Sequence, residues 1–413
     1  MGPSEPLSAL TAVDTVENVQ VYVADSVRYD ALPDRVSRRG VTARAIAPST
    51  CSHSSFPSLM SGTYPATHEL WRETERLPEK PELLRERNGT MVGFDTETQY
   101  IEYDRKPPLR WVHMDHESRL DAMKPPFVHV TFDIGAHSPY GFHNGVYERR
   151  KDFFRDYSDE TVLRERYRND CVDSADRFLT LLDRLAERDL LARTLVVFTA
   201  DHAELLGETE NGGRFGHLHP VCPDLVNVPV VFMGAGLPAG ESYSGVLSGL
   251  DVAPTALAAL GRPIPDDIEG SEVWNTVPRS DRRVRTDVWA HRALDVFGRE
   301  SSADAYAATS VWDADGGIVF HRKSALARAA YVCPNNYLGR PSAAVRANWT
   351  PRKQARFLRI YFSPRVTHGR PNFDADDATK LVPPQFERRT YDRGRAEHAD
   401  HSVAPPRFVR RLV

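Results

Sequence analysis

Five apolar runs are the feature that most limits the folds open to this chain. Each is rich in Val, Phe, Tyr or Thr, and several are apolar on both faces. Such runs are typical of central strands in a mostly parallel sheet that helices cover. The runs lie at about 19–25, 90–95, 127–133, 194–200 and 228–233.

Helical patterns lie between these runs, so a three-layer αβα sandwich is the predicted fold. The clearest pattern covers about 159–188, where apolar residues recur at helical spacing. We expect two further helices, at 52–61 and at 251–261. After about residue 280 the periodicity weakens and short β-type runs alternate with Arg, Pro and Asn. We therefore predict a catalytic domain over 17–280 and a smaller α+β subdomain over 281–413.

Carboxylates lie at the C-terminal ends of three of the strand-like runs, at Asp25, Asp133 and Asp201. Open α/β sheets place their chemistry at the carboxyl ends of such strands. Histidines come close behind in the sequence, at His137, His202 and His217. Carboxylate with imidazole suits Zn²⁺ or Mn²⁺. The pattern favours a two-metal hydrolase.

Structural alternatives exist for several of these residues. Asp25 could pair with Arg28 or cap a helix, because an unpaired buried charge is costly. His219 competes with His217 for a place in the site. Glu204 and Glu208 are more typical of structural roles than of metal ligands.

A hydroxyl-rich stretch at 49–56 supplies candidate nucleophiles at the predicted start of a helix. A helix N-terminus favours a bound phosphate or sulfate, and a metal lowers the pKa of a bound hydroxyl. Four side chains qualify from this reasoning alone: Thr50, Cys51, Ser52 and Ser54. Helix capping and loop hydrogen bonds are the ordinary roles of such residues.

The order and spacing of these segments resemble the alkaline phosphatase superfamily in its sulfatase-like branch. The resemblance covers roughly residues 17–265. The segments that carry it are Asp-Ser-Val-Arg-Tyr-Asp (25–30), Leu-Met-Ser-Gly-Thr-Tyr-Pro-Ala-Thr-His (59–68), Asp-His-Ala-Glu-Leu-Leu-Gly-Glu (201–208), Val-Asn-Val-Pro-Val-Val-Phe (226–232) and Asp-Val-Ala-Pro-Thr (251–255).

The resemblance assigns roles to the candidate residues. It implies Ser52 as the nucleophile, ten residues before Gly62. It implies two divalent ions, Zn or Mn, one of them on Ser52. The first would be held by Asp25, Asp201 and His202, and the second by Asp133, His137 and His217. We expect Arg28 or Arg214 to balance the charge of a bound ester.

The chain departs from the formylglycine sulfatases at the nucleophile. Those enzymes carry Cys-x-Pro-x-Arg around the modified residue, whereas here His53 and Ser55 follow Cys51 at the Pro and Arg positions. In the register of Ser52 the corresponding residues are Ser54 and Phe56. The departure favours phosphate over sulfate as the substrate group.

The sequence therefore predicts a metal-dependent hydrolase of phosphoric esters, a phosphodiesterase or phosphomonoesterase. Two alternatives use the same site: a sulfuric ester hydrolase and a phospho-group transferase. A third is a catalytically silent scaffold with this fold. The formal net charge of −4 argues against a nucleic-acid binder. No apolar run approaches the roughly 20 residues of a transmembrane helix, and the N-terminal residues predict a cytoplasmic protein.

Overall fold

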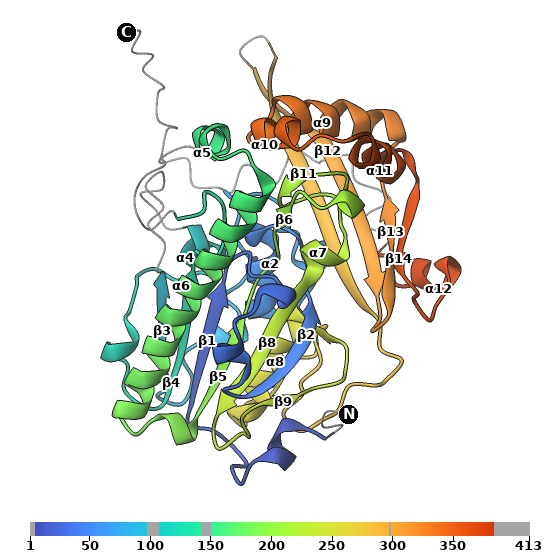
Figure 1. Ribbon diagram of the computed structural model, residues 1–413. Coiled ribbons are helices and arrows are strands. Elements are labelled where there is room, and N and C mark those ends of the chain that lie inside the picture. Colours follow the sequence, from blue (N-terminus) through green and yellow to red (C-terminus); the bar gives the residue numbers. More distant parts are fainter. Residues whose placement is uncertain (1–4, 97–106, 142–149, 297–298, 384–413) are drawn as a thin grey trace.

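A mostly parallel sheet forms the centre of the larger domain. The computed structural model describes residues 5–96, 107–141, 150–296 and 299–383 (Figure 1). The strands of its eight-stranded sheet, in spatial order, are β10 (Leu247–Ser248), β2 (Val41–Ile46), β8 (Asn227–Gly234), β5 (Thr194–Thr199), β1 (Asn18–Ala24), β4 (Phe127–Asp133) and β3 (Met91–Thr96), and β9 (Glu241–Ser242) pairs with β2. Strand β8 runs antiparallel to both of its neighbours, and the other pairs are parallel.

Helices cover both faces of this sheet. On one face, Phe178 of α6 (Glu160–Glu187) packs against Tyr22 of β1. On the other face, Phe56 of α2 (Ser52–Ser61) packs against Phe132 of β4, and α8 (Val252–Ala259) lies beside α2. The predicted three-layer α/β fold with a mostly parallel sheet is confirmed.

One central strand, β2, was missed by the sequence prediction. Its residues, Val-Thr-Ala-Arg-Ala-Ile, alternate between buried and half-buried positions. The interspersed Thr and Arg break the apolar run on which the other strands were identified. The antiparallel direction of β8 was also unpredicted, because strand composition carries no information on direction.

The remaining short elements of the larger domain lie in its loops and edges. They are α1 (Asp34–Ser37), α3 (Pro65–His68), α4 (Pro107–Trp111), α5 (Arg150–Asp156), α7 (Pro223–Val226), β6 (Leu205–Leu206) and β7 (Phe215–Gly216).

A separate antiparallel sheet follows residue 280 and has its own helical cover (Figure 1). Its strands are β11 (Val284–Val296), β12 (Arg299–Trp312), β13 (Gly316–His321) and β14 (Arg365–Gly369). Its helices are α9 (Ala325–Leu338), α10 (Ser342–Ala347), α11 (Pro351–Phe362) and α12 (Ala375–Thr379). This part has the predicted α+β character, and the exact division at 280 stays a prediction.

Strand β11 is bonded to the loop that leads from β2 into α2. The backbone N–H of Asp287 donates to the carbonyl of Pro48 at 2.9 Å. The hydroxyl of Ser49 donates back to the carbonyl of Asp287 at 2.8 Å. The second sheet therefore fixes the backbone just before Ser52.

Candidate active site

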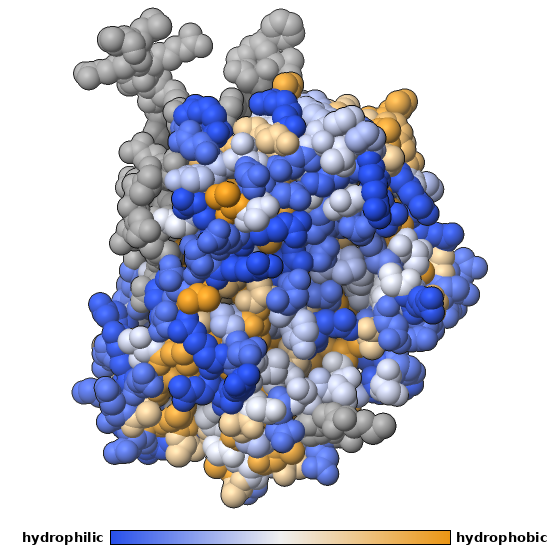
Figure 2. Space-filling view, viewed as in Figure 1, coloured by the Kyte–Doolittle hydropathy of each residue, from blue (hydrophilic) through white to orange (hydrophobic). Residues whose placement is uncertain are grey.

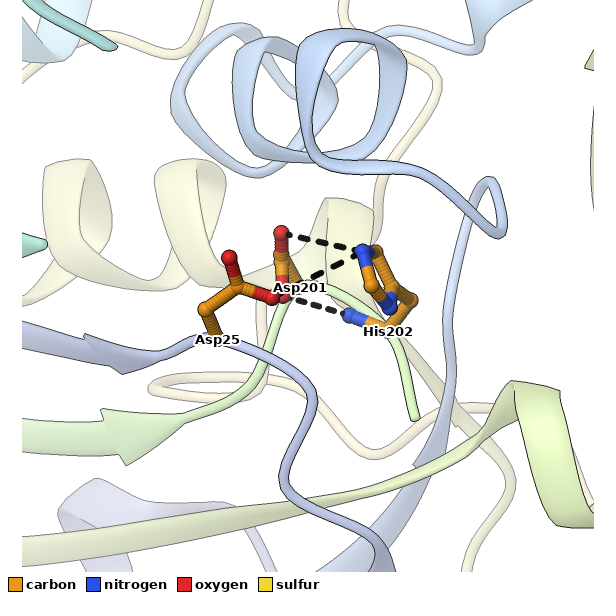
Figure 3. A group of neighbouring side chains, drawn as sticks. All are labelled: Asp25, Asp201 and His202. Atoms are coloured by element: carbon orange, nitrogen blue, oxygen red, sulfur yellow. Dashed lines mark hydrogen bonds and ion pairs between the residues drawn. The ribbon is translucent and has the colours of Figure 1, made fainter. Parts of the chain in front are cut away.

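Two buried carboxylates meet at the carboxyl ends of neighbouring strands. Asp25 directly follows β1, and Asp201 lies two residues after β5. Because β1 and β5 are parallel partners, both side chains reach the same edge of the sheet. His202 joins them, and one ligand atom from each residue lies within 4.8 Å of the others. Figure 3 shows the three side chains facing one another.

The hydrogen bonds of Asp201 are incomplete in a way that suits a cation. Its Oδ1 accepts the backbone N–H of His202 at 2.8 Å and that of Ser26 at 3.3 Å. Its Oδ2 is buried and has no hydrogen-bond partner among the described residues. A buried carboxylate in this state is costly unless a positive charge compensates it. The arrangement fits a divalent metal ion.

Hydrogen bonding fixes the orientation of His202. Its Nδ1 lies 2.9 Å from the carbonyl of Ala203, so Nδ1 carries the proton and donates it. Its Nε2 then faces the carboxylates, 3.7 Å from Asp25 Oδ1 and 3.7 Å from Asp201 Oδ2. This is the tautomer that a metal-binding imidazole needs.

Ser52 directs its hydroxyl to this group of ligands from the first residue of α2. Its Oγ lies 3.1 Å from His202 Nε2 and 3.4 Å from Asp25 Oδ2. The side chain is half-buried, whereas the three ligands are fully buried. The hydroxyl therefore stands between the ligands and the exterior, where a substrate would approach.

The other three candidates for the nucleophile are engaged elsewhere. The hydroxyls of Thr50 and Ser54 each donate to a backbone carbonyl at 2.8 Å. The Cys51 sulfur lies 3.5 Å from Nε2 of His53. Burial opposes ionisation of Cys51, but the charge and hydrogen bond of His53 leave the pKa of the thiol below its ordinary value. These contacts favour Ser52 over its neighbours.

The structure does not assemble the expected second trio of metal ligands, because Asp133 points away from the two histidines. Its side chain turns to the face covered by α6, opposite to Phe132, since alternate strand residues face opposite sides. There Arg177 binds both carboxylate oxygens, at 3.0 and 2.9 Å, and the Ser174 hydroxyl donates at 2.6 Å. Asp133 is therefore occupied by an arginine, a correction to the role expected for it.

His137 and His217 remain close to the first group of ligands. The ring of His217 lies 4.6 Å from that of His202 and 5.0 Å from that of His137, measured between centroids. Nδ1 of His217 lies 3.1 Å from Glu204 Oε2, and the Tyr140 hydroxyl donates to Glu204 Oε1 at 3.3 Å. The sequence favoured a structural role for Glu204. Its position two residues after His202 was a signal that it lies beside the candidate site.

A glycine brings His137 into this cluster. Gly135, in the turn after β4, has φ +56°. A Cβ at this position would lie 2.2 Å from the carbonyl oxygen of Asp25. The next residue, Ala136, donates its N–H to that same carbonyl at 2.9 Å. The turn after β4 is therefore held directly against the turn after β1.

The two arginines expected to bind substrate occupy structural positions. Arg28 is buried and forms ion pairs with three carboxylates, those of Asp30, Glu208 and Asp224. Burial lowers the pKa of its guanidinium, but these carboxylates raise it well above its usual range overall. Arg214 is also buried and donates to the side chain of Asn336 at 2.8 Å, toward the second domain. Neither arrangement resembles an open anion site.

Comparison with known proteins agrees with this architecture. The family model described as Sulfatase matches residues 115–262. The chain is 46% identical over 337 residues to the low-salt glycan biosynthesis sulfotransferase Agl7 of Haloferax volcanii, covering 81% of this chain and 82% of that protein. It is 30% identical to human arylsulfatase K over 100 residues, which cover 24% of this chain and 18% of that protein.

Solved structures share the fold at low sequence identity. A phosphonate monoester hydrolase from Silicibacter pomeroyi aligns with a TM-score of 0.54 and 17% identity, covering 74% of this chain and 87% of that one. A 2-O GAG sulfatase aligns with a TM-score of 0.55 and 14% identity, covering 89% of this chain and 100% of that one. These similarities support the arrangement of the sheet and its helices.

Proposed function

This chain belongs to the sulfatase family within the alkaline phosphatase superfamily, and on that premise we propose that it transfers a sulfuryl group from a sulfate ester by way of Ser52. The observation that carries the proposal is the contact of the Ser52 hydroxyl with His202 and Asp25. The neighbouring hydroxyls of Thr50 and Ser54 are bonded to backbone carbonyls. Ser52 is thus the hydroxyl best placed to attack.

Three residues would hold one divalent ion in this proposal: Asp25, Asp201 and His202. Such an ion would lower the pKa of the Ser52 hydroxyl and neutralise part of the charge of the ester. Zinc and manganese, the ions expected from sequence, both accept carboxylate with imidazole. With Asp133 bound to Arg177, the ligands support one ion better than the two that were expected.

The residues of the chain supply the remaining chemistry. Ser52 Oγ, after releasing its proton to water, bonds to sulfur while the bond from sulfur to the leaving oxygen breaks. Glu204 holds Nδ1 of His217, so a proton for the leaving oxygen would pass through Nε2 of that ring. The oxygen of an acceptor hydroxyl then bonds to sulfur while the bond from sulfur to Ser52 Oγ breaks; the acceptor's proton returns to Nε2 of His217, and Ser52 Oγ takes up a proton from water.

Two considerations favour sulfate as the transferred group. A sulfate monoester carries one negative charge, whereas a phosphate monoester is close to a dianion at neutral pH. One ion with neighbouring imidazoles is therefore better matched to a sulfate monoester than to a phosphate monoester. The relative that is 46% identical over four-fifths of both chains is named a sulfotransferase acting in glycan biosynthesis. We accordingly propose a carbohydrate hydroxyl as the acceptor.

A phosphoric ester is the second candidate substrate, and a specific feature favours it. The sequence around Cys51 and Ser52 lacks the Pro and Arg of the formylglycine motif. An unmodified serine on a metal is a recognised nucleophile for phosphoryl transfer. This second candidate retains the phosphodiesterase or phosphomonoesterase activity expected from sequence.

Matched chromogenic esters separate the two candidates. The protein, loaded with Zn²⁺ or Mn²⁺, is assayed with 4-nitrophenyl sulfate, 4-nitrophenyl phosphate and bis(4-nitrophenyl) phosphate. The proposal predicts the highest kcat/KM for the sulfate, and an increase in 4-nitrophenol release when a sugar alcohol is added as acceptor. Mass spectrometry should then detect the sulfated acceptor. Preferential turnover of either phosphate ester would replace the proposal with the second candidate.

The variant Ser52→Ala tests the nucleophile. We expect kcat to fall by at least about 10³-fold, because no other group replaces the attacking oxygen. Metal content, measured by plasma mass spectrometry, should stay near that of the parent protein. Ser54→Ala is the matched control, since its hydroxyl is bonded to a carbonyl, and it should keep most of the activity. Full activity in Ser52→Ala would show that another group attacks.

A further inference from the structure

Positive charge is concentrated in one stretch of the second domain. Between Gly316 and Phe373 the sequence contains eleven lysines and arginines and neither aspartate nor glutamate, although the whole chain has a formal net charge of −4. The stretch spans β13, α9, α10, α11 and β14. Folding therefore gathers one sign of charge on a single part of the surface.

Most of these cations face the exterior. Two of them pair with carboxylates from the larger domain: Arg352 with Glu210 at 3.7 Å, and Lys353 with Glu160. Six arginines of the stretch are exposed, and they are Arg340, Arg346, Arg352, Arg359, Arg365 and Arg370.

Helices α9 and α11 lie side by side in opposite directions. Near the start of α9, the Arg328 guanidinium donates to the carbonyl of Tyr361, close to the end of α11, at 2.9 Å. Near the end of α9, the ring of Tyr337 contacts that of Phe357 at 6.1 Å between centroids. The two helices thus form one continuous layer over the second sheet.

Large apolar side chains project from this same layer into solvent. Leu326 and Leu338 on α9 are 80% and 75% exposed, and Phe362 at the end of α11 is 46% exposed. Trp349, just before α11, is 51% exposed. In Figure 2, apolar surface appears over α9 at the upper edge of the molecule, amid hydrophilic surface. Leucine and aromatic residues among arginines are the composition of helices that lie in a membrane interface.

We propose that the α9–α11 layer, defined as residues 325–362, docks onto the surface of a bilayer that contains anionic lipid. The exposed arginines would attract the lipid headgroups, each adding to the binding free energy. The exposed leucines, Trp349 and Phe362 would enter the boundary between headgroups and acyl chains. Among the described residues no helix has the length and apolar character to cross a bilayer, and the proposed contact is peripheral.

The apolar side chains favour a membrane over a nucleic acid. A surface that binds only phosphate backbones gains nothing from an aliphatic side chain that is 80% exposed, as Leu326 is. Insertion into an interface, in contrast, gains free energy in proportion to the apolar surface removed from water. Replacing the exposed apolar residues should therefore weaken binding to a membrane but not binding to a nucleic acid.

Vesicle flotation with the metal-loaded full chain tests the proposal. Vesicles of pure phosphatidylcholine are compared with vesicles that also contain phosphatidylglycerol, at low and at physiological salt. We expect binding to the anionic vesicles to exceed binding to the neutral ones by at least about tenfold, and to weaken as salt is raised. Equal binding to both vesicles, or no binding to either, would overturn the proposal.

Two double variants separate charge from apolar contact. Arg340→Glu with Arg359→Glu should lower binding to anionic vesicles at least tenfold, and Leu326→Ser with Phe362→Ser should lower it severalfold. The matched control, Arg39→Glu with Arg168→Glu, makes the same charge change at exposed arginines of the larger domain and should keep most of the binding. Melting temperature and turnover of a soluble ester should be unchanged in all three.

The serine variant also distinguishes a membrane from a nucleic acid. If the protein binds duplex DNA as tightly as anionic vesicles, and Leu326→Ser with Phe362→Ser affects neither, the surface recognises polyanions in water and the membrane proposal fails. Loss of vesicle binding in this variant, with any DNA binding unchanged, would support insertion of the apolar side chains. An equal loss in the Arg39 and Arg168 control would overturn the assignment to the α9–α11 layer.

Discussion

Asp201 and Asp133 are both buried carboxylates at the ends of parallel strands, yet their surroundings differ. Both oxygens of Asp133 are bonded, to Arg177 and Ser174. Asp201 keeps one buried oxygen without a hydrogen-bond partner among the described residues. Asp133 is neutralised by an arginine of the protein, whereas Asp201 fits a metal ion bound from solution. Residue type and strand position are thus insufficient to identify a metal ligand.

A third buried carboxylate, Asp170, avoids an unpaired charge in another way. Asp170 of α6 accepts only one donor in the described structure, the N–H of Gly141, at 3.0 and 2.8 Å from its two oxygens. Burial raises the pKa of Asp170 to about 7. Near neutral pH this side chain therefore binds a proton where Asp133 binds an arginine. The following predictions test the differences between these three residues, starting with the largest effect.

Asp201→Asn should have the largest effect on function. We expect the variant to lose its bound metal and at least about 10³-fold in kcat, because a neutral amide is a poor ligand for a hard cation. Without metal, the variant should be at least as stable as the parent, since it carries one fewer buried charge. Metal analysis and calorimetry with and without a chelator check both statements. Retention of metal by the variant would contradict the assignment of this site.

Asp133→Asn should mainly affect stability. Removal of one partner leaves the charge of Arg177 partly buried and unpaired, and should lower the free energy of unfolding by about 3 kcal/mol. Metal content should be unchanged. Denaturant titration measures the loss, and replacing Arg177 by Met in the same chain should recover part of it. A loss of metal in Asp133→Asn would restore this residue to a second metal site.

Asp170→Asn should remove a pH dependence of stability. Because the folded pKa of about 7 exceeds the ordinary value of 3.8, the folded chain retains a proton that the unfolded chain releases between these values. The contribution of Asp170 to the stability of the parent is therefore largest below about pH 4 and is lost as the pH rises to about 7. In the variant this contribution should be absent, which is a difference of about 4 kcal/mol between acid and neutral pH. Identical pH profiles of melting temperature in both proteins would contradict the prediction.

The sequence was sufficient for most of the central sheet, because strands buried on both faces leave continuous apolar runs. Strand β2 was missed because Thr42 and Arg44 interrupt its apolar pattern. The long helix α6 was predicted within a residue or two, since its apolar spacing and the N-cap Asp159 are local signals. Local signals carry no direction, so the antiparallel course of β8 was not predictable.

The candidate site was only partly predictable for a related reason. The order of the segments in the sequence predicted that Asp25, Asp201, His202 and Ser52 lie close together. The structure has them close because the carboxyl ends of neighbouring parallel strands lie at one edge of the sheet. The error over Asp133 arose from α6, whose Arg177 lies 44 positions later in the chain. The partners of Arg28 are similarly distant, at Glu208 and Asp224. Long-range ion pairs of this kind leave no pattern in a single sequence.

The bonds between β11 and the loop before α2 also set a condition on biosynthesis. Ser49 and Asp287, which these bonds join, are 238 positions apart. When a ribosome has completed the larger domain, strand β11, which fixes the backbone beside Ser52, has not yet emerged. The nascent protein therefore cannot hold Ser52 in its final position until the second sheet has emerged and folded. Fragments that end before residue 284 should therefore lack the proposed activity.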